Sequence, residues 1–298
     1  MSAARTFLVG GHVLTAPPLE PGLHIVSTPI GNLGDVTIRA LETLAACDML
    51  ACEDTRITRR LLERYGISRK PVAYHEHNAR EAGPRLLAAL AEGKAVALVS
   101  DAGTPLVSDP GYRLVSEARL AGHRVIPVPG ASAPLAALAA SGLPSDDFRF
   151  IGFLPAKEKA RRDRLAELAG SPSTLIAFES PNRLAATLAA IAGTCGPDRT
   201  VCVARELTKR FETITAGNAK ELSDQFGSET IKGEIVLLIA PAENDGEMWA
   251  GERLDTLLRD LLSAMPVSKA AREAADATGL PKTDLYRRLL ELKEGGRE

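Results

Sequence analysis

A loop rich in glycine, proline and aspartate, SDAGTPLVSDPG, occupies residues 100–111 directly after the apolar run KAVALV. Such a run predicts a buried strand. Glycine allows positive φ and close approach of a ligand to the backbone, and proline presets the turn. The loop contains no lysine, whereas a phosphate cradle of the G-x-x-x-x-G-K-[ST] type needs one. We therefore expect a ligand that is less negative than a nucleoside triphosphate.

Four other polar or glycine-rich loops also follow predicted strands. They are TPIGNLGD after LHIVS, EDTR after DMLAC, EHN after VAYH, and PGASA after VIPV. Parallel strands place their carboxyl ends at one edge of a sheet, and ligands bind in the crevice outside that edge. The five loops together therefore predict one binding site that offers backbone N–H and C=O groups with carboxylates nearby.

The elements that must position these loops alternate between strand and helix from Leu23 onwards, which predicts a mostly parallel sheet. We expect Asp35 and Asp109 to be N-caps and Pro84 to lie in the first turn of its helix. The second half ends in three closely spaced strands, RTVCVARE, FETITAG and GEIVLLIAP, which predict a mixed sheet. The last fifty residues read as helices, one of them capped by Ser268.

The expected fold class is α/β, with two α/β domains and a small C-terminal helical domain. The expected ranges are a flexible tail at 1–22, a parallel-sheet domain at 23–144, a mixed-sheet domain at 145–241 and helices at 249–298. The polar segment AENDGEM is the expected linker before the helices.

Composition narrows the class of protein. The chain has 298 residues, a net charge of −2 and 45% hydrophobic residues, which is ordinary for a globular protein. No apolar run approaches the roughly 20 residues of a membrane span, and the N-terminus lacks an apolar core with a cleavage site. Four cysteines without C-x-x-C spacing predict buried thiols in a reducing compartment. We expect a cytoplasmic protein with no metal site and no membrane contact.

The motifs in order are STPIGNLGDVTIRALETL, CEDTRITRRLL, YHEHN, VSDAGTPLVSDPG, VIPVPGASA, GFLP, FESPNRL, VARELTKRFE and GEIVLLI. From about Leu23 to Pro241 they resemble the tetrapyrrole-methylase-type S-adenosylmethionine transferases. Within these they resemble the ribosomal small-subunit RNA methyltransferase I group, which methylates the ribose 2′-oxygen of a cytidine in the decoding region. EDTR with ARELTKRFE is specific to that group, and the helical tail is similar to the group's C-terminal extension.

The resemblance implies that S-adenosylmethionine is bound between the two domains of a homodimeric enzyme that acts on small-subunit ribosomal RNA. It also implies which residues contact the cofactor. These are Pro29, Gly31, Asp101, Ala102, Gly103, Thr104, Ala131 and Ser132 from the first domain, and Phe178, Ala204, Arg205 and Glu206 from the second. The donor carries a sulfonium cation and no phosphate, so a loop without lysine suits it.

Methyl transfer to a hydroxyl is aided by alignment of the reacting atoms and by a base that accepts the proton. The candidate bases are Glu53, Asp54 and His75. Each has another interpretation, since the two carboxylates can pair with neighbouring arginines and the histidine can be a hydrogen-bonded part of the scaffold. In the same way, Asp101 can cap its own turn. Glu206 can form an internal ion pair with Arg205 that shapes the pocket.

Two basic clusters are candidates for contacts with RNA phosphates. The first contains Arg56, Arg59, Arg60 and Arg64, and the second contains Lys157, Lys159, Arg161, Arg162 and Arg164. The second could also be a solvated helix face, because Glu158 and Asp163 interrupt it, but its position beside the predicted cleft favours RNA. The mixed charges of the terminal helices favour packing or positioning of RNA over reading of DNA.

Two other functions remain open at this stage. A tetrapyrrole C-methyltransferase acting on a precorrin or uroporphyrinogen would also use arginines, since its macrocycle carries carboxylates. A non-catalytic RNA-binding factor would use only the basic helix and the tail. The specific motifs and the helical tail favour ribosomal RNA, and the intact glycine loops argue against a non-catalytic protein.

Overall fold

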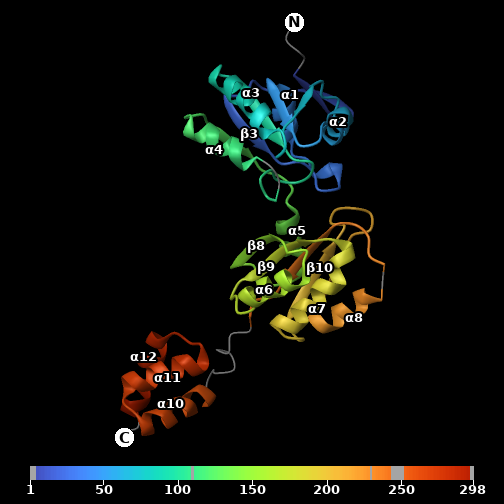
Figure 1. Ribbon diagram of the computed structural model, residues 1–298. Helices are drawn as coiled ribbons and strands as arrows, with labels where there is room; N and C mark the ends of the chain where they lie inside the picture. Colours follow the sequence, from blue (N-terminus) through green and yellow to red (C-terminus); the bar gives the residue numbers. More distant parts are fainter. Residues whose placement is uncertain (1–4, 109–110, 229, 243–251, 296–298) are drawn as a thin grey trace.

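The computed structural model describes residues 5–108, 111–228, 230–242 and 252–295. It contains two five-stranded sheets, a small N-terminal hairpin and a group of C-terminal helices (Figure 1). The two sheets form successive domains, as the alternating pattern of the sequence predicted.

The first sheet has the order β5-β4-β6-β3-β7, and every neighbouring pair is parallel. The strands are β3 Gly22–Val26, β4 Met49–Cys52, β5 Pro71–Ala73, β6 Ala95–Val99 and β7 Val125–Val128. The prediction of a parallel sheet is therefore confirmed, and the polar loops that follow its strands start from one edge.

Helices cover both faces of this sheet. Helices α1 (Ile38–Ala46) and α2 (Thr55–Arg64) pack on one face, and α3 (Ala79–Ala91) and α4 (Tyr112–Leu120) on the other. Side chains alternate along each strand, so Val99 joins the core with α1 and α2 while its neighbour Leu98 joins the core with α3 and α4. Burial on both faces explains why these strands are continuous apolar runs.

Residues 6–15 differ from the expected flexible tail at 1–22. They form an antiparallel hairpin of β1 (Thr6–Val9) and β2 (His12–Thr15), closed by two glycines with positive φ. Phe7 is only 1% exposed and packs with α1 and α2, and the Leu8 N–H donates to the Tyr65 carbonyl over 2.8 Å. The hairpin therefore belongs to the first domain, because its apolar side chain completes that core.

The helix starts differ from several expectations. The N-cap of α1 is Thr37, whose hydroxyl accepts from the Ala40 N–H over 3.1 Å, and the expected cap Asp35 lies in the preceding 3₁₀ helix η1 (Leu33–Asp35). Helix α3 begins five residues before Pro84. Its first turn packs alanines against the core, which outweighs the one backbone hydrogen bond that an internal proline removes.

Helix α4 follows Gly111 at its N-cap, and the expected cap Asp109 lies outside the described residues. In the C-terminal region the N-cap of α11 is Pro266, so Ser268 lies within the helix and does not cap it.

The second sheet has the order β11-β10-β12-β9-β8. Its strands are β8 Phe148–Phe153, β9 Thr174–Glu179, β10 Thr200–Arg205, β11 Thr213–Asn218 and β12 Ile235–Ile239. Only β8 and β9 are parallel, and the other pairs are antiparallel. The expected mixed sheet is thus confirmed.

Helices α6 (Glu158–Leu168), α7 (Leu184–Cys195) and α8 (Ala219–Gly227) cover one face of the second sheet. Helix α5 (Ala133–Ser141) covers the other, where Leu138 packs with Ile176 and Val236. Helix α5 falls within the range 23–144 expected for the first domain, yet its apolar side contacts the second sheet. The chain therefore crosses between the sheets immediately before α5 (Figure 1).

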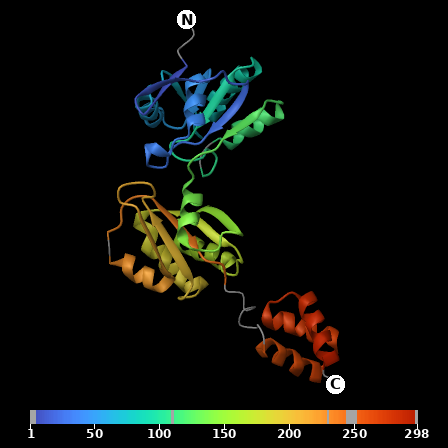
Figure 2. The same cartoon turned by 180° about the vertical axis from the view of Figure 1, so that it is seen from behind.

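The C-terminal helices α10 (Glu252–Ala264), α11 (Val267–Thr278) and α12 (Lys282–Gly295) have their own core, in which Leu258, Ala274 and Leu289 are buried. Figure 2 shows them as a separate group beyond the second sheet. Arg288 on α12 forms two 2.8–2.9 Å bonds to Asp255 on α10. The expected linker AENDGEM lies almost entirely outside the described residues.

The four cysteines are free thiols, and three of them, Cys47, Cys52 and Cys202, are buried. Burial raises the pKa of the Cys47 thiol to about 12, so this side chain is an inert part of the core. Within the described residues, no helix is both long enough and apolar enough to cross a membrane.

Candidate active site

A cavity of about 390 Å³ lies between the two sheets. The loops after β3, β6 and β7 form its first-domain wall. Its second-domain wall comes from the ends of β8, β9 and β10 and the start of β12. Since β12 is antiparallel to β9 and β10, its start lies at the same edge as their ends. Both sheets therefore turn a loop-bearing edge toward one space, where the sequence predicted a ligand.

Six of the twelve residues expected to contact the cofactor line this cavity. They are Ala102, Gly103, Thr104, Ser132, Phe178 and Ala204. The other six expected residues, Pro29, Gly31, Asp101, Ala131, Arg205 and Glu206, do not line it, and their contacts show what they do instead.

Hydrogen bonds between three loops hold the first-domain wall together. Thr28 and Gly103 exchange backbone bonds of 2.9 and 3.0 Å, next to the buried Pro29. The Thr104 hydroxyl lies 3.0 Å from the Ser27 hydroxyl and donates to the Ala131 carbonyl over 3.3 Å. Ala131 and Pro29 are thus parts of the scaffold behind the wall.

Gly103 has a φ of 77°, and a Cβ there would lie 3.3 Å from the Ile30 side chain. A larger side chain would be strained by the backbone conformation and would also press on a neighbour that lines the cavity. Glycine is therefore required at this point of the loop.

Asp101 connects two loops at the carboxyl edge of the first sheet. Its Oδ1 accepts from the backbone N–H of Asp54 over 2.9 Å. Asp101 does not line the cavity, and this bond does not cap its own turn, so the cofactor contact of Asp101 stays a prediction. Asp101 holds the loop after β6 against the loop after β4.

Asp54 is the N-cap of α2 and forms an ion pair with Arg56. Its carboxylate accepts from the Arg56 N–H over 2.8 Å and from the exposed Arg56 guanidinium. These hydrogen bonds lower the pKa of Asp54 to about 2. The carboxylate is therefore ionised and already engaged, as the ion-pair interpretation predicted.

The other two candidate bases, Glu53 and His75, lie in the loops after β4 and β5 at this edge. Asn78 accepts from the His75 backbone N–H over 2.8 Å and donates to the Ala73 carbonyl over 2.9 Å. The imidazole Nδ1 of His75 is buried without a hydrogen-bond partner among the described residues, and its ring lies 6.0 Å from that of His77. Glu53 is partly buried beside them. None of the three candidate bases lines the cavity.

A buried carboxylate that the sequence did not suggest organises the second-domain wall. Glu179, 3% exposed, lines the cavity and accepts from the Ser180 N–H, the Arg183 guanidinium and the Thr187 hydroxyl over 2.6–2.7 Å. Buried charges are tolerated when paired and hydrogen-bonded in this way. The spacing of Glu179 and Arg183 by four residues, within FESPNRL, was the signal that could have found this pair.

Three phenylalanines form a cluster on the same wall. The Phe178 ring lies 5.1 Å from that of Phe150 and 5.4 Å from that of Phe153. Phe153 lines the cavity and is 60% exposed. It lies in the motif GFLP but was not among the predicted contacts, because only the fold brings it beside Phe178.

The turn between β10 and β11 closes another side of the cavity. Glu206 and Thr208 have positive φ values of 53° and 66°, and Leu207 between them is buried and lines the cavity. Glu206 pairs with Lys209 over 2.8 Å, and the Lys209 ammonium also donates to Glu234 over 2.8 Å. The expected pairing of Glu206 with Arg205 is wrong, because Arg205 donates to Thr213 and to the Lys232 carbonyl.

These contacts shift the pKa of both partners. The hydrogen bond from Lys209, followed by that from the Glu234 N–H, lowers the pKa of Glu206. Burial disfavours the charged form of Lys209, yet its bonds to Glu206 and Glu234 keep its pKa above the usual value. Both groups are charged at neutral pH, and the ion pair holds the turn.

The same turn contacts the first domain directly. The Asn32 N–H donates to the Thr208 hydroxyl over 3.0 Å. A Cβ on Gly31 would lie 2.6 Å from the Lys209 Cγ, so only glycine allows this approach. Gly31 therefore serves the contact between the domains and does not line the cavity.

The charge of the cavity wall suits a cationic ligand. No Lys or Arg is among the described residues that line it, whereas Glu179 and Glu234 are. Within the described ranges, no cluster of three or more His, Cys, Asp and Glu side chains could hold a metal ion.

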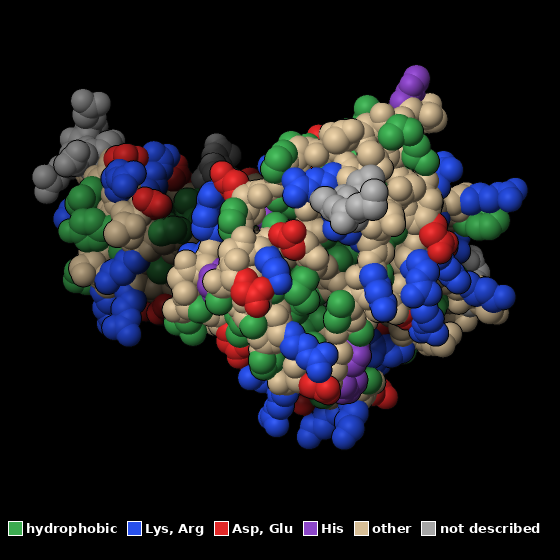
Figure 3. All heavy atoms as spheres, turned by 90° about the horizontal axis from the view of Figure 1, so that it is seen from above, with side chains coloured by type: hydrophobic (Ala, Val, Ile, Leu, Met, Phe, Trp, Pro, Cys, Tyr) green, Lys and Arg blue, Asp and Glu red, His purple; other side chains and the backbone are tan. Residues whose placement is uncertain are grey.

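One of the predicted RNA contacts in the two basic clusters, Arg161, is buried. Arg56, Arg59 and Arg60 on α2 are exposed, and so are Lys157, Lys159 and Arg162 at the start of α6. Arg161 is only 4% exposed and donates to the Ala156 carbonyl over 3.3 Å, so its predicted contact with RNA phosphates is wrong. The helical period turns it toward the core with Leu165. Figure 3 shows several groups of Lys and Arg side chains around the first domain.

Comparisons with known proteins agree with this geometry. Residues 22–223 match the family model for tetrapyrrole (corrin/porphyrin) methylases, and residues 249–293 match the model for the RsmI C-terminal HTH domain. The crystal structure of the methyltransferase CobJ is similar in fold, with a TM-score of 0.56, 21% identity and coverage of 74% of this chain and 94% of that chain. Diphthine synthase is similar too, with a TM-score of 0.55, 16% identity and coverage of 73% and 89%. The fold is that of a tetrapyrrole-methylase-type protein.

Two curated relatives narrow the class further. Both are named ribosomal RNA small subunit methyltransferase I. The protein from Mesorhizobium japonicum is 58% identical over 96% of this chain and 97% of its own length. That from Vibrio cholerae is 47% identical over 92% and 96%. This chain belongs to the ribosomal RNA small subunit methyltransferase I family, which confirms the resemblance seen in its motifs.

Proposed function

We propose that this protein transfers a methyl group from S-adenosylmethionine to the ribose 2′-hydroxyl of a cytidine in the decoding region of small-subunit ribosomal RNA. The observation that carries the proposal is the cavity between the two sheets, which is lined mainly by apolar side chains, with two carboxylates and no cation among its described lining residues. The names of the relatives, which are 47–58% identical over nearly the whole chain, support ribosomal RNA as the substrate.

The residues present fit the proposed donor. S-adenosylmethionine supplies an electrophilic methyl group on a sulfonium cation when bound. The loop of Ala102, Gly103 and Thr104 forms one wall, and Phe178 and Ala204 offer apolar surface on the other. A lysine in this loop would repel the cation, so its absence from residues 100–111 follows from the chemistry.

The contribution of the chain to the reaction is mainly orientation. The hydrogen bonds of Thr28, Gly103 and Thr104 fix the donor loops before any ligand binds. A preorganised wall of this kind helps to place the methyl carbon in line with the attacking hydroxyl, which is a large source of rate in displacement reactions.

For the proton of the hydroxyl we keep Glu53 and His75 as the proposed acceptors. Asp54 is the weakest of the three candidates, since its pKa is held near 2 and its oxygens are occupied by Arg56. The exposed Arg56, Arg59 and Arg60 on α2, and Lys157, Lys159 and Arg162 on α6, are the proposed contacts to RNA phosphates. We further propose a homodimer that acts in the cytoplasm.

The alternative of a tetrapyrrole C-methyltransferase has weaker support. A uroporphyrin-III C-methyltransferase shares the fold, but at 19% identity and a TM-score of 0.51 the likeness concerns the fold alone. The match of residues 249–293 to the HTH domain model favours RNA.

The deciding experiment is an incubation of the purified protein with radiolabelled S-adenosylmethionine and small ribosomal subunits from a strain that lacks the activity. We expect label at one ribose 2′-oxygen of the RNA. A parallel reaction offers uroporphyrinogen. Label in the tetrapyrrole and not in RNA would reject the proposal, and RNA binding without donor binding would indicate the non-catalytic factor.

A further inference from the structure

Arg210 and Phe211 project from the turn between β10 and β11 into solvent. The Phe211 side chain is 65% exposed, and the Arg210 guanidinium lies 5.4 Å from the centre of its ring. Burying such a ring would gain considerable free energy, so leaving it exposed has a cost. An exposed aromatic ring with a cation over its face is a surface that a base can stack against.

The turn that carries this pair is rigid. The Lys209 N–H donates to the Glu206 carbonyl over 3.0 Å, and the Glu212 N–H donates to the Lys209 carbonyl over 3.2 Å. The Glu212 carboxylate also accepts a hydrogen bond from the Thr208 N–H. The turn is also tied to the loop before β12, because Arg205 donates to the Lys232 carbonyl over 3.3 Å. The backbone that carries the aromatic ring is therefore held in place before a ligand arrives.

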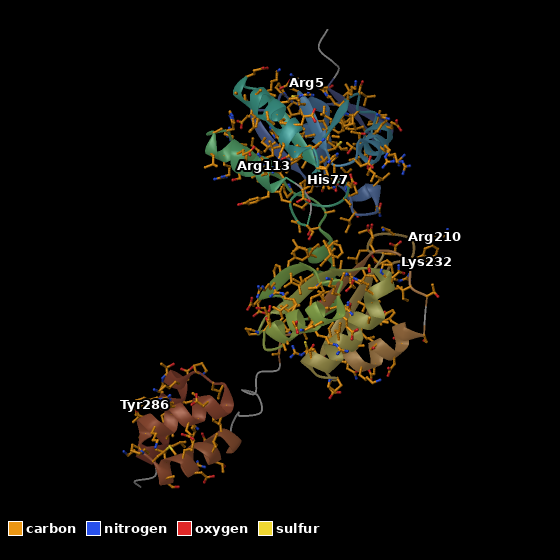
Figure 4. All side chains as sticks on the ribbon, in the orientation of Figure 1. Arg5, His77, Arg113, Arg210, Lys232 and Tyr286 are labelled. Carbon is orange, nitrogen blue, oxygen red and sulfur yellow. The ribbon has the colours of Figure 1, made fainter. Side chains whose placement is uncertain are left out.

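Positive charge is available beside the ring. Figure 4 shows Arg210 and Lys232 at the same corner of the second domain, on the side toward the first domain. Neither side chain forms an ion pair with a described residue, whereas the nearby acids are engaged. Glu206 and Glu234 bind Lys209, and Glu212 accepts from the backbone of the turn.

The surface lies next to the cavity. Leu207, four residues before Phe211, lines the cavity, and so do Gly233 and Glu234, which follow Lys232. Four residues of extended chain span at most about 14 Å, so the ring is near the cavity rim. A nucleotide next to the one whose ribose enters the cavity can reach it.

We propose that Phe211, Arg210 and Lys232 form a stacking platform for a single-stranded nucleotide that flanks the methylated one. The base stacks on Phe211, while Arg210 and Lys232 neutralise adjacent phosphates. Sequence-tolerant recognition of unpaired RNA uses this combination of aromatic ring and cation. The inference rests on the proposed function, since it presumes that RNA is the substrate.

The test uses the full-length protein and compares Phe211→Ala, Phe211→Trp and the double variant Arg210→Gln with Lys232→Gln. The matched control is Phe148→Ala, because Phe148 is also exposed, at 41%, and is followed by an exposed arginine, but does not line or border the cavity. Affinity is measured for a single-stranded oligoribonucleotide spanning the decoding region and for small subunits, at several salt concentrations. Donor affinity and melting temperature are measured for every variant.

We expect Phe211→Ala to weaken RNA binding at least about fivefold, with Phe211→Trp retaining it. The double variant should lower the slope of log affinity against log salt by about 1.4 for two phosphate contacts. Donor affinity and melting temperature should stay unchanged. RNA affinity of Phe211→Ala equal to that of Phe148→Ala would overturn the platform.

A change of sedimentation coefficient in Phe211→Ala would also overturn it, by assigning the ring to a contact between subunits. The test distinguishes failure of the stacking platform from failure of the proposed function. If wild-type protein labels RNA and the platform variants bind RNA normally, only the platform is rejected. If wild-type protein neither binds nor labels RNA, the proposed function is rejected and the platform with it.

Discussion

The carboxylate of Asp101 accepts a hydrogen bond from the backbone N–H of Asp54 over 2.9 Å, across 47 residues of sequence. The loop expected to hold a cofactor and the loop expected to supply a base are thereby joined. Asp101 acts on the cavity through its neighbours Ala102, Gly103 and Thr104, which line it.

Replacing Asp101 should consequently weaken donor binding without abolishing the fold. In Asp101→Ala the bond to Asp54 is lost and the loop after β6 is released, so calorimetry should show weaker binding of S-adenosylmethionine. Asp101→Asn is the matched control, since its Oδ1 can still accept from the Asp54 N–H. Equal donor affinities of the alanine variant and the wild type would show that this bond does not position the loop.

Gly103→Val should have a larger effect. Its backbone has a φ of 77°, and the new Cβ would lie 3.3 Å from Ile30. A β-branched residue at positive φ costs roughly 1–3 kcal/mol, which corresponds to about five- to 150-fold weaker donor binding if the loop must move. Circular dichroism should remain that of the wild type. Full donor affinity in this variant would remove the loop from the proposed site.

The buried Glu179 should be important for stability. Glu179→Ala leaves the Arg183 guanidinium and the Thr187 hydroxyl without their partner, and breaking a buried pair costs about 3 kcal/mol or more in the free energy of unfolding. Thr187→Val removes a single hydrogen bond to the buried carboxylate and should cost about 2 kcal/mol. Urea denaturation measures both. A cost for Glu179→Ala no greater than that for Thr187→Val would contradict this account.

Acid should weaken the turn between β10 and β11. The pKa of Glu206 is lowered in the folded state, so the ion pair with Lys209 contributes stability that is fully present above the ordinary value of 4.5. This stability is lost as the pH falls through the lowered pKa. The difference in unfolding free energy between wild type and Glu206→Gln should therefore shrink below about pH 4.5. A difference that stays constant down to pH 2 would exclude a role for the charge of Glu206.

The exposed arginines of α2 should affect RNA and not the donor. Arg59→Glu combined with Arg60→Glu should reduce affinity for small subunits and give a shallower salt dependence, since fewer counterions are released. Donor affinity should be unchanged because neither residue lines the cavity. The matched control is Arg113→Glu with Arg119→Glu, two exposed arginines on α4. Equal losses in both pairs would indicate a general charge effect.

Arg161 and Arg162 are neighbours in sequence with different expected roles. Arg161 is buried, so Arg161→Ala should lower the melting temperature, while Arg162→Ala should leave it unchanged and reduce RNA affinity modestly. Sequence alone grouped them because a run of basic residues carries no sign of which one faces the core. The helical period decides that, and it depends on where α6 meets the second sheet.

Other differences between the sequence-based expectations and the structure also arise from packing between distant elements. The broken apolar stretch at residues 6–15 predicts a tail but forms a hairpin, because the burial of Phe7 depends on a core made by α1 and α2. Helix α5 was grouped with the first domain by sequence order, although its apolar face fits the second sheet. The expected partner of Glu206 is its sequence neighbour Arg205, but Glu206 lies in the turn after β10 with a φ of 53°, where its carboxylate meets Lys209.

The sequence by itself determined the class of fold, the family, and the edge of the first sheet at which the ligand loops gather, because strand–loop–helix alternation and motif order are local features. The tertiary structure alone decided which side chains meet across the cavity. Phe153 comes to Phe178, Thr208 comes to Asn32, and Asp101 comes to Asp54 only when the sheets are assembled. Such contacts depend on packing between elements distant in sequence, for which no local pattern exists.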